Sequence, residues 1–324
     1  MLLVLDVGNT NTVLGVFAKA TNLHPQRSAA GAPAHYDLLV ANWRVSTIVR
    51  QTTDEYGVVF RQLFSMASLQ ASEIDGIIIS SVVPPLDSTL RQVCERYFHK
   101  KPLFIEPGVK TGMPVLYDNP AEVGADRIVN SVAAFEKYGG PCIVVDFGTA
   151  TTFDCVSPRG AYQGGIICPG IGISAEALFA RTARLPRVDI RKPTQLIGSN
   201  TVGSLQSGLY YGYLSLVDGI VKLLLDEMGN DTKVVATGGL ASLIGPGSQY
   251  IEHVDEFLTL QGLRIIWERN ANAKPARQPA VKGVTTAAAV SQQPSPAEKP
   301  LPSKTVSAKQ IPAKPWPSGK SRSH

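Results

Sequence analysis

The stretch Asp6-Val7-Gly8-Asn9-Thr10-Asn11-Thr12 recurs about 140 residues later in the chain as Asp146-Phe147-Gly148-Thr149-Ala150-Thr151-Thr152. Each copy ends a short apolar run, turns at a glycine and enters a second run typical of a strand. The Asp, the Gly and the last Thr match at equal offsets in the two copies. A repeat in the same strand–turn–strand context indicates a duplicated domain.

Outside the repeat, strands and helices alternate along most of the chain. Short runs rich in Val and Ile predict strands at residues 2–7, 12–17, 40–45, 76–80, 103–105, 142–146, 151–156 and 233–236. Apolar residues at helical spacing predict helices at residues 54–68, 86–97, 125–138, 174–180, 202–228 and 259–268. This alternation predicts an α/β protein.

Two segments lack this alternation. Residues 21–34 separate the strands 12–17 and 40–45, and we predict a surface insertion at 19–39 that forms an extended hairpin loop. From residue 270 onward the chain is rich in Pro, Ala and Lys and has too few large apolar residues to bury a core. We therefore predict a disordered basic tail at 270–324.

The tail also accounts for the net charge of +5. It holds nine Lys or Arg and one acidic residue after position 270, so the remaining 22 basic and 25 acidic residues give the body a charge of −3. A nucleic-acid partner is therefore not expected for the body, and only the tail suits one. Four cysteines without CxxC spacing and five scattered histidines predict a cytoplasmic protein with reduced thiols and no zinc site. We expect no membrane span, which needs about 20 apolar residues.

The two repeated turns have the composition of phosphate-binding loops. Gly8 and Gly148 let the backbone approach an anion closely. Phosphate oxygens can accept hydrogen bonds from backbone N–H groups of the turns and from the side chains of Thr10, Asn11, Thr149 and Thr151. Carboxylates repel phosphate, so Asp6 and Asp146 fit this role only if Mg²⁺ or a monovalent cation bridges them to it. Because the sequence has no Walker-type lysine, we expect metal ions and backbone dipoles to neutralise the phosphates.

Asp126 and Arg127 lie at the start of the predicted helix 125–138. Asp126 fits two roles: an acid that caps the first helical turn, or a general base that accepts a proton from a substrate hydroxyl. Arg127 suits a clamp for a carboxylate or for the transferring phosphoryl group.

Two glycine-rich segments also have two interpretations each. Gly238-Gly239, after the strand 233–236, either lets a base or ribose approach the backbone or forms a plain turn. The segment Gly164–Gly172 is either a loop folded over a ligand or a structural crossover.

Taken together, these motifs resemble those of type III pantothenate kinases, which belong to the superfamily of actin, sugar kinases and chaperone ATPases. The resemblance covers residues 1–269. It implies duplicated actin-like (ribonuclease H-like) ATPase domains at residues 1–120 and 121–269, with a cleft between them. The insertion and the tail are not part of the family pattern.

The resemblance also implies roles for individual residues. The first repeated stretch resembles the family's first phosphate loop, which implies ATP contacts at Asp6, Gly8, Asn9, Thr10, Asn11 and Thr12, with Asp6 as a candidate Mg²⁺ ligand. The second resembles the second phosphate loop, which implies an ATP contact at Thr149 and a monovalent cation, K⁺ or NH₄⁺, at Asp146. Thr237-Gly238-Gly239 is similar to the adenosine motif, which implies a nucleotide contact at Gly238.

Tyr117-Asp118-Asn119-Pro120 followed by Gly124-Ala125-Asp126-Arg127 is similar to the family's substrate segment. This similarity implies that the substrate is bound by Tyr117, Gly124, Ala125, Asp126 and Arg127, with Asp126 as the catalytic proton acceptor. Asn200-Thr201-Val202 resembles a segment that implies one more substrate contact, at Thr201.

The activity implied by the resemblance is the ATP-dependent phosphorylation of pantothenate to 4′-phosphopantothenate, the first step of coenzyme A biosynthesis, with Mg²⁺ or a similar divalent cation. Two alternatives stay open: a catalytically altered family member that acts as a transcriptional accessory factor, and a kinase for another small hydroxyl substrate, because a fold does not determine a substrate. The resemblance also implies a homodimer. The helix 202–228 carries an apolar stripe that suits either a dimer contact or the core, formed by Leu205, Leu209, Tyr213, Leu216 and Ile220.

Overall fold

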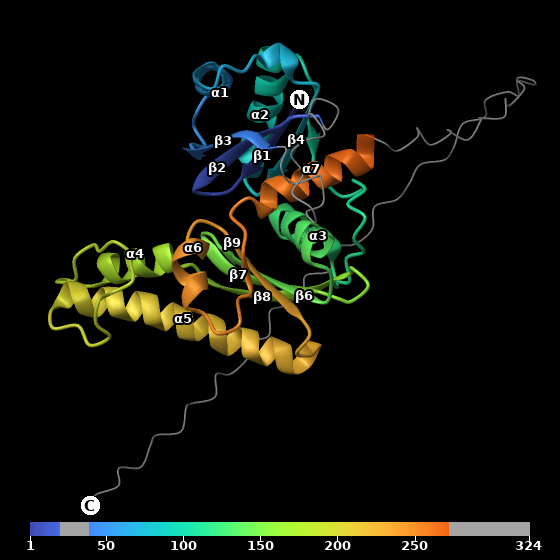
Figure 1. The fold of residues 1–324 in the computed structure, drawn as a ribbon. Coiled ribbons are helices and arrows are strands. Elements are labelled where there is room, and N and C mark those ends of the chain that lie inside the picture. Colours follow the sequence, from blue (N-terminus) through green and yellow to red (C-terminus); the bar gives the residue numbers. More distant parts are fainter. Residues whose placement is uncertain (20–38, 272–324) are drawn as a thin grey trace, which may run out of the picture. The chain divides into compact units, whose positions relative to one another are not determined.

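Two five-stranded mixed sheets form the framework of the computed structural model, which describes residues 1–19 and 39–271 (Figure 1). The predicted insertion at 19–39 and tail at 270–324 lie almost entirely outside these residues. Sheet A has the order β3-β2-β1-β4-β5 and consists of β1 (Leu2–Val7), β2 (Asn11–Phe17), β3 (Leu39–Ser46), β4 (Gly76–Ser81) and β5 (Leu103–Phe104). Sheet B has the order β10-β9-β6-β7-β8 and consists of β6 (Cys142–Phe147), β7 (Ala150–Val156), β8 (Tyr162–Pro169), β9 (Lys233–Thr237) and β10 (His253–Val254).

The two sheets repeat one topology. β1, β2 and β3 pair antiparallel in sheet A, and β6, β7 and β8 do the same in sheet B. β1 also pairs in parallel with β4, as β6 does with β9. The predicted pairing of the strands 12–17 and 40–45 is therefore confirmed as the β2–β3 hairpin, and the repeated sequence corresponds to a repeated fold.

Helices connect and cover the strands. The α-helices of the described residues are α1 (Thr53–Met66), α2 (Pro84–Phe98), α3 (Ala125–Tyr138), α4 (Ile171–Arg181), α5 (Thr201–Met228), α6 (Ala241–Ile244) and α7 (Leu258–Ala271). On sheet A, Phe60 of α1 and Leu90 of α2 belong to the same buried apolar cluster as Leu5 of β1. On sheet B, Val217 of α5 and Val145 of β6 belong to another. Burial of these apolar faces is the main stabilising contribution to such layers.

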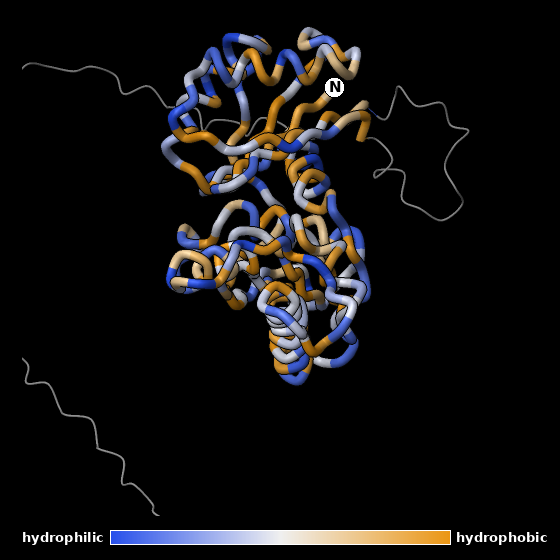
Figure 2. The backbone as a smooth tube through the Cα atoms, turned by 90° about the vertical axis from the view of Figure 1, so that its left-hand side faces the viewer, coloured by the Kyte–Doolittle hydropathy of each residue, from blue (hydrophilic) through white to orange (hydrophobic). Residues whose placement is uncertain are grey.

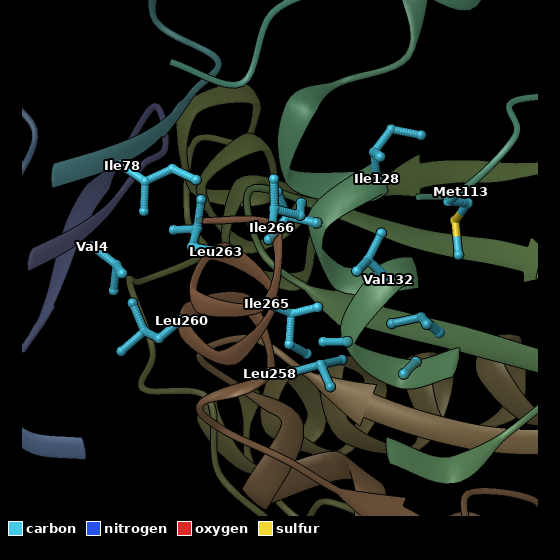
Figure 3. Close-up of a cluster of buried hydrophobic side chains, with 14 of the residues drawn as sticks. Val4, Ile78, Met113, Ile128, Val132, Leu258, Leu260, Leu263, Ile265 and Ile266 are labelled. Atoms are coloured by element: carbon cyan, nitrogen blue, oxygen red, sulfur yellow. The ribbon is translucent and has the colours of Figure 1, made fainter. Parts of the chain in front are cut away.

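A third apolar cluster joins the two halves of the fold. α3 and α7 pack against each other, and their cluster includes Val4 and Ile78 of sheet A and Val144 of sheet B. Figure 3 shows Leu263 of α7 beside Val4 and Ile78, with Val132 of α3 in the same cluster. α7, at the end of the predicted domain 121–269, thus packs on β1 and β4 of the first sheet.

The glycine-rich segment 164–172 differs from both interpretations that its composition suggested. It is the greater part of strand β8 followed by the start of α4, and not a loop over a ligand or a crossover. A Cβ atom at Gly165 would lie 1.8 Å from the carbonyl oxygen of Phe153 on the neighbouring strand β7. The close pairing of β7 and β8 therefore requires glycine at this position. Because glycine is otherwise rare in strands, the sequence pattern did not predict β8.

Helix α5 is long and apolar enough to cross a membrane by length and composition alone. One such helix is weak support for a membrane span. Asp218 and Lys222 lie within it, and Val217 and Val221 are buried in the cluster over sheet B. In Figure 2 this helix, seen nearly end-on at the bottom, carries both hydrophobic and hydrophilic residues. Its apolar character is accounted for in part by packing on the sheet.

Candidate active site

The two repeated turns touch each other. The first loop (residues 8–10) connects β1 to β2, and the second loop (residues 148–149) connects β6 to β7. The hydroxyl oxygens of Thr10 and Thr149 lie 3.0 Å apart. Asn9, Thr10, Gly148 and Thr149 are all exposed. Tertiary packing therefore brings phosphate-binding candidates from both halves to one open position.

The glycines of the two loops close the turns. The Gly8 N–H donates to the carbonyl oxygen of Asn11 at 3.0 Å, and the Gly148 N–H donates to that of Ala150 at 3.0 Å. These two N–H groups are used inside the turns. The exposed residues Asn9, Thr10 and Thr149 carry hydroxyl and amide side chains that can donate to a phosphate.

The first loop is one residue longer than the second. Asp6 pairs with the residue seven positions later, whereas Asp146 pairs with the residue six positions later. Thr12 therefore takes the sheet position of Thr151 and not that of Thr152, and it is buried like Thr151, with its hydroxyl 2.9 Å from that of Thr47. Thr12, a predicted ATP contact, therefore forms a hydrogen bond within the β2–β3 hairpin. The equal offsets seen in the sequence do not correspond to equal positions in the two sheets.

Three carboxylates, those of Asp6, Asp126 and Asp146, lie within electrostatic range of one another near the loops. Burial, then the negative charges of Asp126 and Asp146, raise the pKa of Asp6 to about 8. Burial and the charge of Asp126 likewise raise the pKa of Asp146 to about 7, although Asn130 donates to its carboxylate at 3.0 Å. A cluster of this kind favours a bound cation, because a positive charge relieves the repulsion between the acids.

Asp126 occupies the first turn of α3, after Gly124 at the N-cap position and Ala125. Its Oδ1 accepts the N–H of Arg127 at 2.8 Å, which is a capping role. Burial raises the pKa of the Asp126 carboxyl all the same. The two predicted roles are thus compatible, because capping holds the carboxylate in place and burial makes it a stronger base.

Arg127 is held by a buried acid that the sequence analysis missed. Its Nε donates to Oδ1 of Asp154 at 2.7 Å, and its Nη2 lies 2.6 Å from the same oxygen. The hydroxyl of Tyr162 donates to Asp154 at 2.9 Å, and Asp154 itself is fully buried. The sequence does contain a signal for this contact: Asp154 is an acid within the apolar run of β7, and a buried acid needs a polar or charged partner.

Tyr117, a predicted substrate residue, lies beside this ion pair. Its ring centroid is 6.4 Å from that of Tyr162, and its ring edge is 3.4 Å from the position that a Cβ of Gly164 would take. The structure therefore brings Tyr117 and Arg127 together through Tyr162, as expected for parts of one substrate site.

Gly238 lies against the second loop. It has a φ of +93°, and a Cβ there would be 2.4 Å from Oδ1 of Asp146. Only glycine suits both the left-handed backbone and this contact. The glycine pair thus places the predicted nucleotide contact beside the predicted cation ligand.

Thr201 is not brought to this cluster by any contact among the described residues. It is the first residue of α5, where the side chain of Asn200 accepts the Gly203 N–H at 2.8 Å. The neighbouring cavity, about 410 Å³, is lined by residues from 191 to 206. Thr201 therefore belongs to another part of this chain than Asp126.

The donors around the loops suit hard cations. The described residues contain no group of three His, Cys, Asp or Glu that could hold a metal by itself. Mg²⁺ is usually bound through one or two carboxylates, with phosphate oxygens and water completing its shell. Asp6, Asp146 and the hydroxyls of Thr10 and Thr149 fit that pattern.

Comparison with known proteins identifies the family. The type III pantothenate kinase family matches residues 2–223. The chain belongs to this family. Curated type III pantothenate kinases are 69% identical in Koribacter versatilis (86% of this chain and 99% of the relative), 56% in Myxococcus xanthus (83% and 99%) and 52% in Halalkalibacterium halodurans (83% and 100%).

The predicted family, fold class and enzyme class are thereby confirmed. The chain has an α/β fold in which two mixed sheets repeat one topology, and it phosphorylates pantothenate with ATP in coenzyme A biosynthesis. The shared region covers nearly the whole length of these relatives, and includes both loops, α3 and the start of α5.

Proposed function

We propose that Asp126 is the general base that activates the primary hydroxyl of pantothenate for attack on the γ-phosphate of ATP. The observation that supports this proposal is that Asp6, Asp126 and Asp146 lie within electrostatic range of one another, and that the loops following Asp6 and Asp146 meet at the contact between Thr10 and Thr149. Apart from burial, Asp126 is the largest cause that raises the pKa of both other acids, which requires it to lie near them.

In this proposal, the residues of the chain have separate roles in binding and proton transfer. The exposed Asn9, Thr10 and Thr149 bind phosphate oxygens, and Gly238 admits the nucleoside side of ATP. Asp126 removes the hydroxyl proton as the oxygen attacks in line. Arg127 contributes positive charge to the substrate side of the site. Phosphoryl transfer needs mainly positioning and charge stabilisation, so no covalent nucleophile is required.

Cations complete the charge balance in this proposal. Asp6 would hold Mg²⁺ or a similar divalent ion, and Asp146 would hold K⁺ or NH₄⁺, with Asn130 orienting its carboxylate. Such cations neutralise the phosphates and link them to carboxylates that would otherwise repel them. The raised pKa values of Asp6 and Asp146 support this role, because bound cations favour the ionised carboxylates.

We further propose a cytoplasmic homodimer, built on α4 and α5. A cavity of about 760 Å³ between these helices is lined almost entirely by apolar groups, including Leu178, Leu205 and Leu216. Leu178 of α4 is 41% exposed in this groove, whereas Leu209 of α5 is buried in the core. The apolar stripe on α5 therefore faces both the core and the open groove. A second copy is the occupant that lets Thr201 of one chain reach the substrate of the other.

The test is ATP-dependent phosphorylation of pantothenate by the wild type and by Asp126→Asn, with Mg²⁺ and K⁺ present. Loss of a general base typically lowers the rate by 10²- to 10⁴-fold, so we expect kcat to fall by about 10²-fold or more while ATP still binds. Asp226→Asn on the exposed side of α5 is the matched control, with activity expected to be unchanged. An active Asp126→Asn enzyme would remove Asp126 as the base.

A further inference from the structure

Arg44 lies in the same row of sheet A as Asp6. In the register of the strands, Asp6 of β1 is opposite Val13 of β2, and Val13 is opposite Arg44 of β3. Directly opposite residues share a face of a sheet, and neighbouring strands are about 4.8 Å apart. Arg44 is therefore two strands, or about 10 Å, from Asp6 at the backbone, on the same face.

That face is the one directed toward the second half of the fold. Trp43 and Val45, on either side of Arg44, pack against the cluster under α1 and α2. Val13, the partner of Arg44, packs instead against the cluster that joins the two sheets. Side chains alternate along a strand, so Arg44 points away from α1 and α2.

The guanidinium reaches the nucleotide side of the site. Nη1 of Arg44 lies 3.1 Å from the position that a Cβ of Gly239 would take. Gly239 follows Gly238, which in turn lies against Asp146. One long side chain from the first half thus reaches the glycine pair of the second half, next to the second loop.

Arg44 carries a positive charge at the exposed edge strand β3. Among the described residues it has no ion pair or hydrogen bond, and its side chain is exposed. Its positive charge nevertheless lowers the pKa of both Asp6 and Asp146, so it lies within electrostatic range of both. An unpaired guanidinium beside a phosphate loop is suited to bind an anion, because its planar fork matches phosphate oxygens.

The duplicated half lacks this feature. The corresponding row in sheet B runs from Asp146 through Thr152 to Ile167. Ile167 is 63% exposed and offers no charge. The cation is therefore not a general property of the repeated fold, and it occurs only on the side that reaches across to Gly239.

We propose that Arg44 is a nucleotide-binding residue that holds the phosphates of ATP against the Gly238-Gly239 turn from the opposite half of the enzyme. The inference rests on the proposed function, in which ATP lies across the two loops. Arg44 would supply the positive side chain that a lysine supplies in P-loop enzymes and that the sequence motifs of this chain lack.

The experiment compares Arg44→Gln with wild type in the full chain, by calorimetric binding of ATP, ADP and adenosine in the presence of Mg²⁺. A charge-assisted hydrogen bond to phosphate corresponds to about 10- to 100-fold in affinity. We expect that loss for ATP and ADP, little change for adenosine, and a raised KM for ATP with the KM for pantothenate unchanged. Arg44→Lys should recover part of the affinity, because the charge remains without the fork.

Arg61→Gln is the matched control, because Arg61 is an exposed arginine of α1 that the site does not use. Its ATP affinity should equal that of the wild type. Equal ATP affinity in a folded Arg44→Gln variant would overturn the proposal, as would an equal loss for adenosine and ATP. Nucleotide binding is measured without pantothenate, so failure of the kinase mechanism and failure of the Arg44 proposal are distinguishable.

Discussion

At the scale of single residues, the site depends on charges that are buried together. Asp154 is fully buried, and its carboxylate binds Arg127 and Tyr162. Burial raises the pKa of Asp154 to about 6, even though Arg127 and Tyr162 lower it. Arg127 therefore has a charged partner above pH 6 and loses that partner's charge below it.

This titration predicts a pH-dependent substrate affinity. The KM for pantothenate should rise as the pH falls from 7 to 5, because a protonated Asp154 no longer orients Arg127 by an ion pair. Asp154→Asn should raise this KM about tenfold at pH 7, the scale of one charged hydrogen bond, and should remove its pH dependence. Steady-state kinetics at several pH values measure both. Tyr162→Phe keeps the ion pair but removes a hydrogen bond that lowers the pKa of Asp154, so the rise in KM should begin at a higher pH than in the wild type.

The raised pKa of Asp154 also determines how the free energy of unfolding changes with pH. The folded pKa lies above the ordinary value of 3.8, so the folded state binds more protons than the unfolded state between about pH 4 and 6. The contribution of Asp154 to the free energy of unfolding is thus full below pH 4 and decreases as the pH rises to 6. Relative to Asp154→Asn, the wild type should lose stability on the order of 3 kcal/mol over this window. If urea denaturation gave the same difference in free energy of unfolding between the wild type and Asp154→Asn at about pH 4 and at about pH 6, the raised pKa of Asp154 would be contradicted.

At the scale of elements, the contact between α3 and α7 holds the site in place. α3 begins with the segment that contains Asp126, the proposed general base, and α7 packs against α3. A Cβ at Gly262 of α7 would lie 2.2 Å from the carbonyl oxygen of Val129 on α3. The two helices can cross this closely only because Gly262 has no side chain.

Two alanine substitutions test this crossing. Gly262→Ala should lower the free energy of unfolding by about 1–3 kcal/mol, because the added methyl group forces α3 and α7 apart. Gly219→Ala in α5 is the matched control, since a Cβ there meets no atom within 4 Å. It should raise stability by up to about 1 kcal/mol, as alanine is the better helix former. Equal effects of the two substitutions in urea denaturation would show that the crossing is not close.

At the scale of the whole molecule, the groove between α4 and α5 carries the proposed dimer. Leu178→Glu places a charge in the apolar groove, where burial against a second copy is costly. We expect light scattering to show a dimer for the wild type and a folded monomer for Leu178→Glu. Leu223→Glu is the control, because Leu223 is 68% exposed on α5 and does not line the groove, so that variant should stay dimeric.

The dimer also predicts that activity is shared between chains. A monomeric Leu178→Glu variant should retain ATP binding and lose pantothenate turnover, because Thr201 would no longer reach the site of a partner. Full turnover by a verified monomer would contradict this role of the second copy.

The sequence by itself determined the local structure and much of the chemistry. The repeated Asp-x-Gly turns predicted the duplication, and the strands and helices follow from apolar periodicity that acts over a few residues. Asp6, Thr10, Thr149, Asp126 and Gly238 were all named from such short motifs, and the structure places them around one pair of loops.

Only the tertiary structure decided which distant residues meet. The burial of Thr12, the ion pair of the buried Asp154 with Arg127, and the approach of Arg44 to Gly239 depend on strand register and on the packing of two sheets. No local pattern encodes these contacts, because the partners lie on strands and loops far apart in the chain. Their pKa values and unpaired charges arise from burial and proximity, which exist only after the two halves have packed together.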